Sequence, residues 1–191
     1  MAKKKWASQT GLTLIELLIT LLLLAVIASL SSNAFSNLIP RHRALTAMTT
    51  FRGLFQFART TAIYSQRTVT VCALTSAQKC TRDWSGDRRI AVFYDNNQNR
   101  YLDEKDEGLR LLDWPARKGV VSWRASLART YINFLPQGNT WQNGTLYYCP
   151  ANGDVRHANA LVLSHSGRSY HPGDSNGDGI REDRKFKPLS C

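Results

Sequence analysis

A single carboxylate, Glu16, interrupts the most apolar part of the sequence. Within residues 12–40 it is the only charged side chain. An unpaired carboxylate in hydrocarbon costs about 2.5 to 3.5 kcal/mol on insertion scales, so this position needs a partner or a function. The residues alone leave two explanations open: Glu16 has such a role, or it lies in the headgroup region of a membrane and stays hydrated.

The histidines do not form a catalytic pattern. The chain has four of them: His42, His157, His165 and His171. None belongs to a His-Glu-x-x-His motif, Ser166 is not in a Gly-x-Ser-x-Gly turn, and no Gly-rich phosphate-binding loop precedes a helix. The neighbours His165 and Ser166 lack a third group to orient them as a nucleophile and base. The sequence therefore predicts a protein that is not an enzyme and has no cofactor.

Two acidic turns are similar to calcium-binding loops. The first places its residues at the first, third, fifth, seventh, ninth and twelfth positions of an EF-hand-like loop: Asp95, Asn97, Asn99, Tyr101, Asp103 and Asp106. Arg100 stands where that loop needs glycine, and no Glu closes it. The second turn, residues 174–179, has its glycine, but Lys185 occupies the closing position. Because Asn and Asp also stabilise turns through their own side chains, we assign no metal ligands.

Composition limits the class of protein. The 191 residues include 25 Lys and Arg, 14 Asp and Glu and 43% hydrophobic residues, with a formal charge of +11. This length and apolar content support one domain with a core and exclude a disordered chain. The apolar residues gather near the N-terminus, which excludes a polytopic membrane protein.

The apolar segment is long enough to cross a membrane. Three lysines, Lys3 to Lys5, precede it, so its N-terminal end should stay in the cytoplasm and the rest of the chain should be exported. Four cysteines follow it: Cys72, Cys80, Cys149 and Cys191. An even number in an exported domain predicts disulfides, and four cysteines allow three connectivities. We favour Cys72–Cys80, which closes a small loop, and Cys149–Cys191, which ties down the C-terminus; no pair has the spacing of zinc ligands.

Periodicity then indicates the elements. Apolar residues after Pro40 recur at steps of three and four, which predicts an amphipathic helical half over residues 41–66: Leu45, Met48, Phe51, Phe55, Ala58 and Ala62. Together with residues 12–40 it would form one long helix, kinked near Pro40. Short alternating or β-branched runs follow and predict strands at residues 68–72, 89–94, 131–135, 145–149 and 160–164. The fold class is α+β, with a mostly antiparallel sheet laid on the helix and a β-rich domain over residues 67–191.

The first residues resemble the class III signal of type IV prepilins and type II secretion pseudopilins. The matching stretch is Gly11-Leu12-Thr13-Leu14-Ile15-Glu16, after a short basic leader, residues 1–11. The resemblance implies that a prepilin peptidase cleaves between Gly11 and Leu12 and methylates the new amine of Leu12. It also implies that Glu16 meets the N-terminal amine of a neighbouring subunit. Loss of the three leader lysines would lower the formal charge from +11 to +8.

Motifs further along resemble the FimT/FimU/GspH branch of that family. They stand in the family's order: Ala58-Arg59-Thr60-Thr61-Ala62, the strand into Cys72, Trp84, Gly86, Val92-Phe93-Tyr94-Asp95-Asn96-Asn97, Leu109-Arg110 and Leu163-Ser164-His165-Ser166-Gly167-Arg168. The resemblance covers almost the whole chain and implies a type IV pilin-like fold.

Some FimT-like pilins bind DNA through a C-terminal Gly-Arg-x-Arg motif, and this chain retains part of it. Gly167-Arg168-Ser169-Tyr170 keeps the first arginine and replaces the second by Tyr170. Tyr170 could stack on an unpaired base, but it cannot neutralise a phosphate. Arg184 and Lys185 would join Arg168 in such a site. The alternative, which we favour, is a solvated surface with Arg168 held in a turn.

The resemblance predicts a minor pilin that helps prime or cap a type IV pilus. Its partners would be other minor and major pilins, prepilin peptidase and the inner membrane, with DNA as a further candidate. It would be a single-pass inner-membrane protein with a periplasmic C-terminal domain, and later part of the pilus tip. Two alternatives stay open: a DNA-binding minor pilin for natural transformation, and a type II secretion minor pseudopilin.

Overall fold

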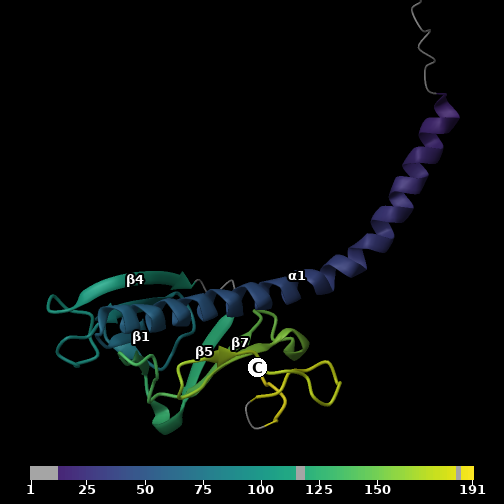
Figure 1. Ribbon diagram of the computed structural model, residues 1–191. Coiled ribbons are helices and arrows are strands. Elements are labelled where there is room, and N and C mark those ends of the chain that lie inside the picture. The colour runs from purple at the N-terminus through teal and green to yellow at the C-terminus, as the bar shows by residue number, and fades with distance from the viewer. Residues whose placement is uncertain (1–12, 115–118, 184–185) are drawn as a thin grey trace, which may run out of the picture. The chain divides into compact units, whose positions relative to one another are not determined.

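The computed structural model describes residues 13–114, 119–183 and 186–191, without the side chains of residues 30–37 (Figure 1). Four residues with predicted roles therefore lie outside the described part: Gly11, Leu12, Arg184 and Lys185. The chain divides into two compact units, one up to Ile39 and one of Pro40–Cys191, and each is described by itself.

Helix α1, Leu14–Ser65, begins in the first unit and ends in the second, with Pro40 inside it. In the first unit its large apolar side chains are exposed: Leu14, Ile15, Leu17, Leu18, Ile19, Leu21, Leu22, Leu23, Leu24, Val26 and Ile27. Within the described residues, no helix meets the combined length and hydropathy that crossing a membrane requires.

In the second unit α1 buries one face against the strands. The buried side chains recur every three or four residues: Ala44, Ala47, Met48, Phe51, Leu54, Phe55, Ala58 and Ala62. The sequence prediction of this face was wrong at Leu45, which is 44% exposed. Ala44 occupies the inward position instead. Because successive residues of a helix are rotated by about 100° around its axis, Leu45 then points away from the core.

Antiparallel strands form two sheets. The first has the order β2-β1-β3-β4, with β6 also paired to β1: β1 Val69–Leu74, β2 Cys80–Thr81, β3 Arg88–Tyr94, β4 Glu107–Trp114 and β6 Tyr131–Phe134. The second has the order β5-β7-β8-β9: β5 Val120–Ala125, β7 Gly144–Cys149, β8 Asn159–Leu163 and β9 Ser169–Tyr170. Single helical turns, η2 Ser126–Ala128 and η3 Val155–His157, lie in the second half of the chain.

The α+β class is confirmed, but the strands divide between two sheets where one was expected. The five predicted strands correspond to β1, β3, β6, β7 and β8, and the prediction missed β2, β4, β5 and β9. Strands β2 and β9 have two residues each, too few to show a period of two. In β4 the buried positions do not alternate, because a register shift interrupts its pairing with β3.

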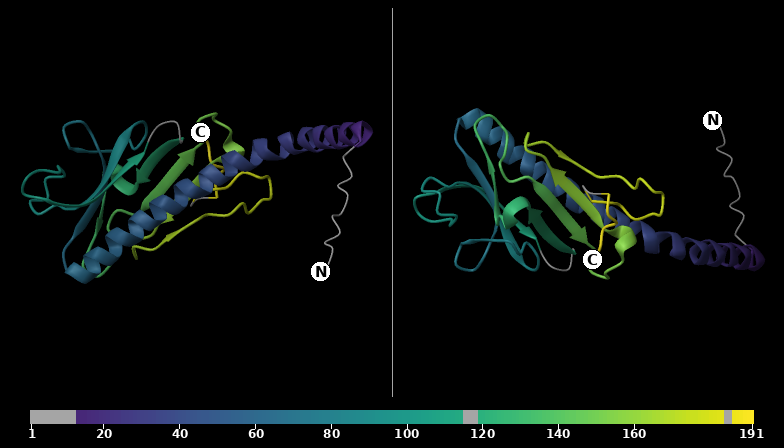
Figure 2. Two further views of the ribbon diagram at one scale, coloured as in Figure 1. Left: turned by 90° about the horizontal axis from the view of Figure 1, so that it is seen from above. Right: turned by 90° about the horizontal axis from the view of Figure 1, so that it is seen from below.

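Two phenylalanines of α1 join the two sheets, whose strands lie along this half of the helix (Figure 2). The Phe51 ring centroid lies 5.2 Å from that of Trp114 on β4. The Phe55 ring lies 6.3 Å from Trp123 on β5 and 6.4 Å from Phe134 on β6. Strands of both sheets therefore share one apolar core with the helix.

Each sheet also has a covered outer face. All five residues of β8 are buried: Leu161 and Leu163 belong to the core under α1, and Ala160 packs in a separate cluster with Leu189 of the C-terminal segment. The first sheet repeats this arrangement, with Cys72 in an outer cluster that Leu102 adjoins. The segments that contain Leu102 and Leu189, and that cover the outer faces, have few apolar side chains. Each therefore needs a further attachment to its sheet.

The Cys149–Cys191 disulfide attaches the C-terminal segment, whereas backbone hydrogen bonds of Arg100 and Leu102 attach the other segment. Both predicted disulfide pairs are confirmed. Cys72–Cys80 links β1 to β2, and Cys149–Cys191 links the end of β7 to the last residue; the Cα atoms lie 5.5 and 5.6 Å apart. The second bond closes the longer loop and should stabilise the fold by about 2 to 4 kcal/mol.

Replacing Phe51 should test the shared core. The side chain is completely buried in the core that α1 shares with both sheets, so Phe51→Ala should lower the free energy of unfolding by about 3 to 5 kcal/mol. Leu45→Ala is the control, because Leu45 is exposed and should cost under about 1 kcal/mol. Urea denaturation of the purified chain would measure both, and equal losses would contradict this account of the core.

Candidate functional site

Glu16 lies in the first turn of α1, exposed, and exchanges hydrogen bonds with Thr13. The backbone N–H of Glu16 donates to Thr13 Oγ1 at 3.3 Å, and that of Thr13 donates to Glu16 Oε2 at 3.5 Å. This reciprocal pair is a capping box, which satisfies two N–H groups at the helix start. Our sequence analysis missed this role, although the Thr-x-x-Glu spacing is its known signal. A carboxylate here also interacts favourably with the helix dipole.

Two of the predicted DNA-binding residues, Arg168 and Tyr170, lie at the hairpin between β8 and β9. Its turn is closed by Ser164, whose N–H donates to the Arg168 carbonyl at 3.0 Å. Arg168 is exposed, and its Nε donates to Ser166 Oγ at 3.3 Å. Tyr170 follows in β9 and is 48% exposed. Since Arg184 and Lys185 lie outside the described residues, a joint basic site remains a prediction.

Gly167, the first residue of that motif, has a packing role. It is buried in a left-handed conformation with φ of 73°, and a Cβ atom at this position would overlap the carbonyl oxygen of Gly138. The same oxygen accepts a hydrogen bond of 2.7 Å from Arg59 Nε of α1. Gly167 therefore lets the hairpin approach the helix and the loop before β7, which accounts for the glycine without a ligand.

Two further basic residues, Arg124 and Lys187, lie at one cavity. Arg124 and Lys187 line a space of about 810 Å³ outside the second sheet, together with Tyr147 and Asp183. The Arg124 guanidinium lies 4.5 Å from the centroid of the Tyr147 ring, and the Tyr147 hydroxyl donates to Asp183 Oδ2 at 3.4 Å. Burial raises the pKa of Tyr147 above its ordinary value. Because the Asp183 carboxylate opposes the charges of Arg124 and Lys187, the net charge of these lining residues is only weakly positive.

The carboxylates of the acidic turns accept hydrogen bonds from the backbone. Asp95 Oδ1 and Oδ2 accept from the N–H groups of Asn99 and Arg100, both at 3.1 Å. Burial raises the pKa of Asp95, whereas the Asn99 side chain, which donates to Asp103, lowers the pKa of Asp103. Asp174 likewise accepts from Gly177 and Gly179. Across the described residues, no three His, Cys, Asp or Glu side chains are grouped to hold a metal ion.

Comparisons with known proteins agree with this architecture. A family model described as type II transport protein GspH matches residues 47–167, and the prokaryotic N-terminal methylation motif matches residues 6–32. Crystal structures of the Pseudomonas aeruginosa (strain PAO1) type IV minor pilin FimU are similar in two space groups. In P21 the identity is 20% and the TM-score 0.54, covering 79% of this chain and 96% of that one. In P65 the identity is 19% and the TM-score 0.51, covering 77% of this chain and 98% of that one. No curated protein sequence matches the chain.

A methylation motif that runs into the start of a long helix, with antiparallel sheets on the C-terminal half of that helix, defines a protein of the type IV pilin class. The chain belongs to the GspH family, which the model covering residues 47–167 shows, and it is a GspH/FimT/FimU-like pilin.

Gly167→Ala should test the packing role of this glycine. Gly153 is the matched control, because its φ is 71° but nothing lies within 4 Å of its Cβ position. Gly153→Ala should cost only the left-handed conformation, about 1 to 2 kcal/mol. Gly167→Ala should cost a further 1 to 3 kcal/mol, roughly, for overpacking against Gly138. Equal losses in urea denaturation would show that the contact with Gly138 is easily relieved.

His171 should make stability depend on pH. Its Nδ1 donates to the Ala160 carbonyl at 3.2 Å, and burial lowers its pKa, with Arg52 and Arg181 acting in the same direction. The folded chain therefore binds this proton more weakly than the unfolded chain, so stability is complete above an unfolded pKa of about 6.5 and decreases below it. His171→Gln should flatten the decrease in urea midpoint between about pH 7.5 and 5. An unchanged slope would show that His171 does not contribute.

Proposed function

We propose that this chain is a minor pilin that helps prime or cap the assembly of a type IV pilus. Prepilin peptidase cleaves it between Gly11 and Leu12 and methylates the new Leu12 amine. The observation that carries the proposal is the methylation motif over residues 6–32, which includes the exposed apolar side chains at the start of α1. The match to the GspH family over the following domain supports the same function.

Before assembly the chain is a single-pass protein of the inner membrane. Residues 12–40 hold the membrane segment, and the leader lysines keep its start in the cytoplasm. The Pro40–Cys191 unit then lies in the periplasm. Its two disulfides support this placement, because such bonds persist in oxidising compartments.

In the filament the exposed leucines of α1 pack against the helices of other pilins. Because these side chains leave lipid and not water, the drive for association is van der Waals packing between helices, which does not fix the axial position of the subunit. Glu16 fixes the axial position, because a carboxylate among apolar helices is costly unless an opposite charge neutralises the carboxylate. The N-terminal amine of a neighbouring pilin supplies that charge.

A type II secretion pseudopilin is the second candidate, because the matching family model is described as a type II transport protein. The methylation motif and the helix are the same in both systems. Twitching motility, protein secretion and natural transformation, assayed together in one deletion strain, distinguish the two and also test for a role in DNA uptake. Loss of secretion with normal twitching would favour the pseudopilin.

Glu16→Ala should separate membrane insertion from assembly. The variant keeps the apolar segment, so it should appear in the membrane fraction, but it should be absent from sheared filaments because the neutralising pair is lost. Thr13→Val is the matched control: it removes the capping hydroxyl, at a cost of about 0.5 to 2 kcal/mol to the helix start, and keeps the carboxylate.

Immunoblots of both fractions would measure the outcome. Thr13→Val should still enter filaments. Normal incorporation of Glu16→Ala would remove the role of Glu16 in register, and loss of both variants would show that capping, rather than charge, decides assembly.

A further inference from the structure

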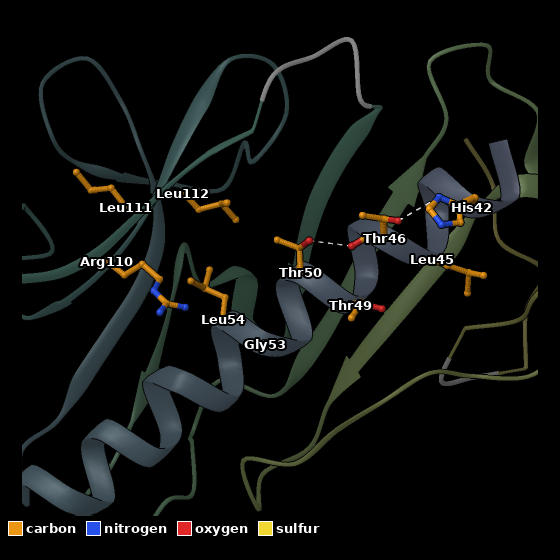
Figure 3. Close-up of a pocket in the computed structure, with 10 residues that line it drawn as sticks. All are labelled: His42, Leu45, Thr46, Thr49, Thr50, Gly53, Leu54, Arg110, Leu111 and Leu112. Atoms are coloured by element: carbon orange, nitrogen blue, oxygen red, sulfur yellow. Dashed lines mark hydrogen bonds between the residues drawn. The ribbon is translucent and has the colours of Figure 1, made fainter. Parts of the chain in front are cut away.

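A groove runs between α1 and β4, entirely within the Pro40–Cys191 unit (Figure 3). It consists of two adjoining cavities of about 530 and 480 Å³. Both are lined by the same four residues: His42, Thr46, Thr50 and Leu112. Figure 3 shows the helix side chains and those of β4 on opposite walls.

The groove is open because its helix wall carries short side chains. Thr46, Thr49, Thr50 and Gly53 line it, and nothing lies within 4 Å of the Cβ position of Gly53. Leu111 of β4 also lines it and is 53% exposed. The groove therefore combines free volume, hydroxyl groups and apolar surface.

Strand β4 presents an unpaired edge. It ends the order β2-β1-β3-β4, and among the described strands only β3 pairs with it. Edge strands carry free N–H and C=O groups, which proteins commonly protect with Lys, Pro or a bulge. The sequence of β4 contains neither Lys nor Pro, and its bulge lies at Leu109, between Gly108 and Arg110. The stretch from Arg110 to Asp113, beside the groove, therefore keeps regular pairing geometry.

The charge of the groove is of one sign. Its ionisable lining residues are His42, Arg43 and Arg110, and all three are basic. The Arg110 guanidinium is held 4.2 Å from the centroid of the Phe57 ring of α1, so its position is defined. An occupant with carboxylates would complement these residues.

We propose that this groove docks an extended segment, apolar and acidic, from the globular domain of another pilin subunit, which adds to β4 as an extra strand. A strand satisfies the free backbone groups of β4, whereas a helix would leave them unpaired, and every second side chain of the strand would enter the groove. The inference rests on the proposed function, because it takes the neighbour from the same filament.

Cross-linking in assembled filaments tests the proposal with the full chain. Cells would express it with p-benzoylphenylalanine in place of Leu111, and after irradiation mass spectrometry would identify the joined peptide. The expected product joins this chain to an acidic segment outside the N-terminal helix of another protein that carries the methylation motif. Immunoblots of sheared filaments would report incorporation separately.

Two further variants test the geometry and the charge. Gly53→Leu fills the groove and should lower the cross-link yield by about tenfold, and Arg110→Glu should lower it by repulsion. Thr60→Leu adds the same side chain to an exposed position of α1 outside the groove and should leave the yield unchanged.

The outcomes separate the two proposals. Absence of the chain from filaments would overturn both. Incorporation without a cross-link, a cross-link to an apolar N-terminal helix, or an undiminished yield from both Gly53→Leu and Arg110→Glu would overturn docking at β4 alone.

Discussion

Burial of one face of α1 is the interaction on which the rest of the domain depends. No backbone ladder among the described strands joins the two sheets, so their connection is made by side chains. Phe51 and Phe55 make it, because they contact aromatic rings from both sheets within one core. β4 and β5 are consecutive in the chain, yet each forms the edge of a different sheet. The division that the helix stabilises therefore also leaves β4 at the edge of its sheet beside the groove, where β3 is its one partner among the described strands.

The outer faces of the sheets follow from the same arrangement. A strand such as β8, buried on both sides, needs a second covering layer, and segments with few apolar residues supply it. Entropy opposes the ordering of such segments, so the Cys149–Cys191 disulfide holds the C-terminal segment where packing alone is weak. The acidic turns lie in these segments, where the carboxylates of Asp95 and Asp174 are used to order the backbone.

The sequence was informative where one local rule decides the outcome. Helical periodicity identified Phe51 and Phe55 as core, and the β-branched runs identified five strands. The positions of the cysteines favoured both disulfides, one because it closes a small loop and the other because it ties down the C-terminus. It failed where pairing or packing decides: β4 has no clear alternation, and no local pattern states which strands share a sheet. At the candidate sites, the residue types were enough to select Glu16 and Gly167 from the sequence. They did not predict which groups these two residues contact. Gly167 was selected for its neighbour Arg168, whereas its observed contacts are with Gly138 and α1.

The contacts of Glu16 explain how a carboxylate that already caps its own helix can also direct assembly. Its capping bonds are long, 3.3 and 3.5 Å, and a cap contributes about 0.5 to 2 kcal/mol. An unpaired carboxylate in hydrocarbon costs about 2.5 to 3.5 kcal/mol, so Thr13 offsets only part of that cost. If α1 packs among other pilin helices, as we propose, the remainder must come from an opposite charge on the neighbour. A subunit shifted along the filament would bury as many leucines but leave Glu16 unpaired. The cap and the charge pair thus act at different stages, the first on the helix of a single chain and the second on the alignment between chains.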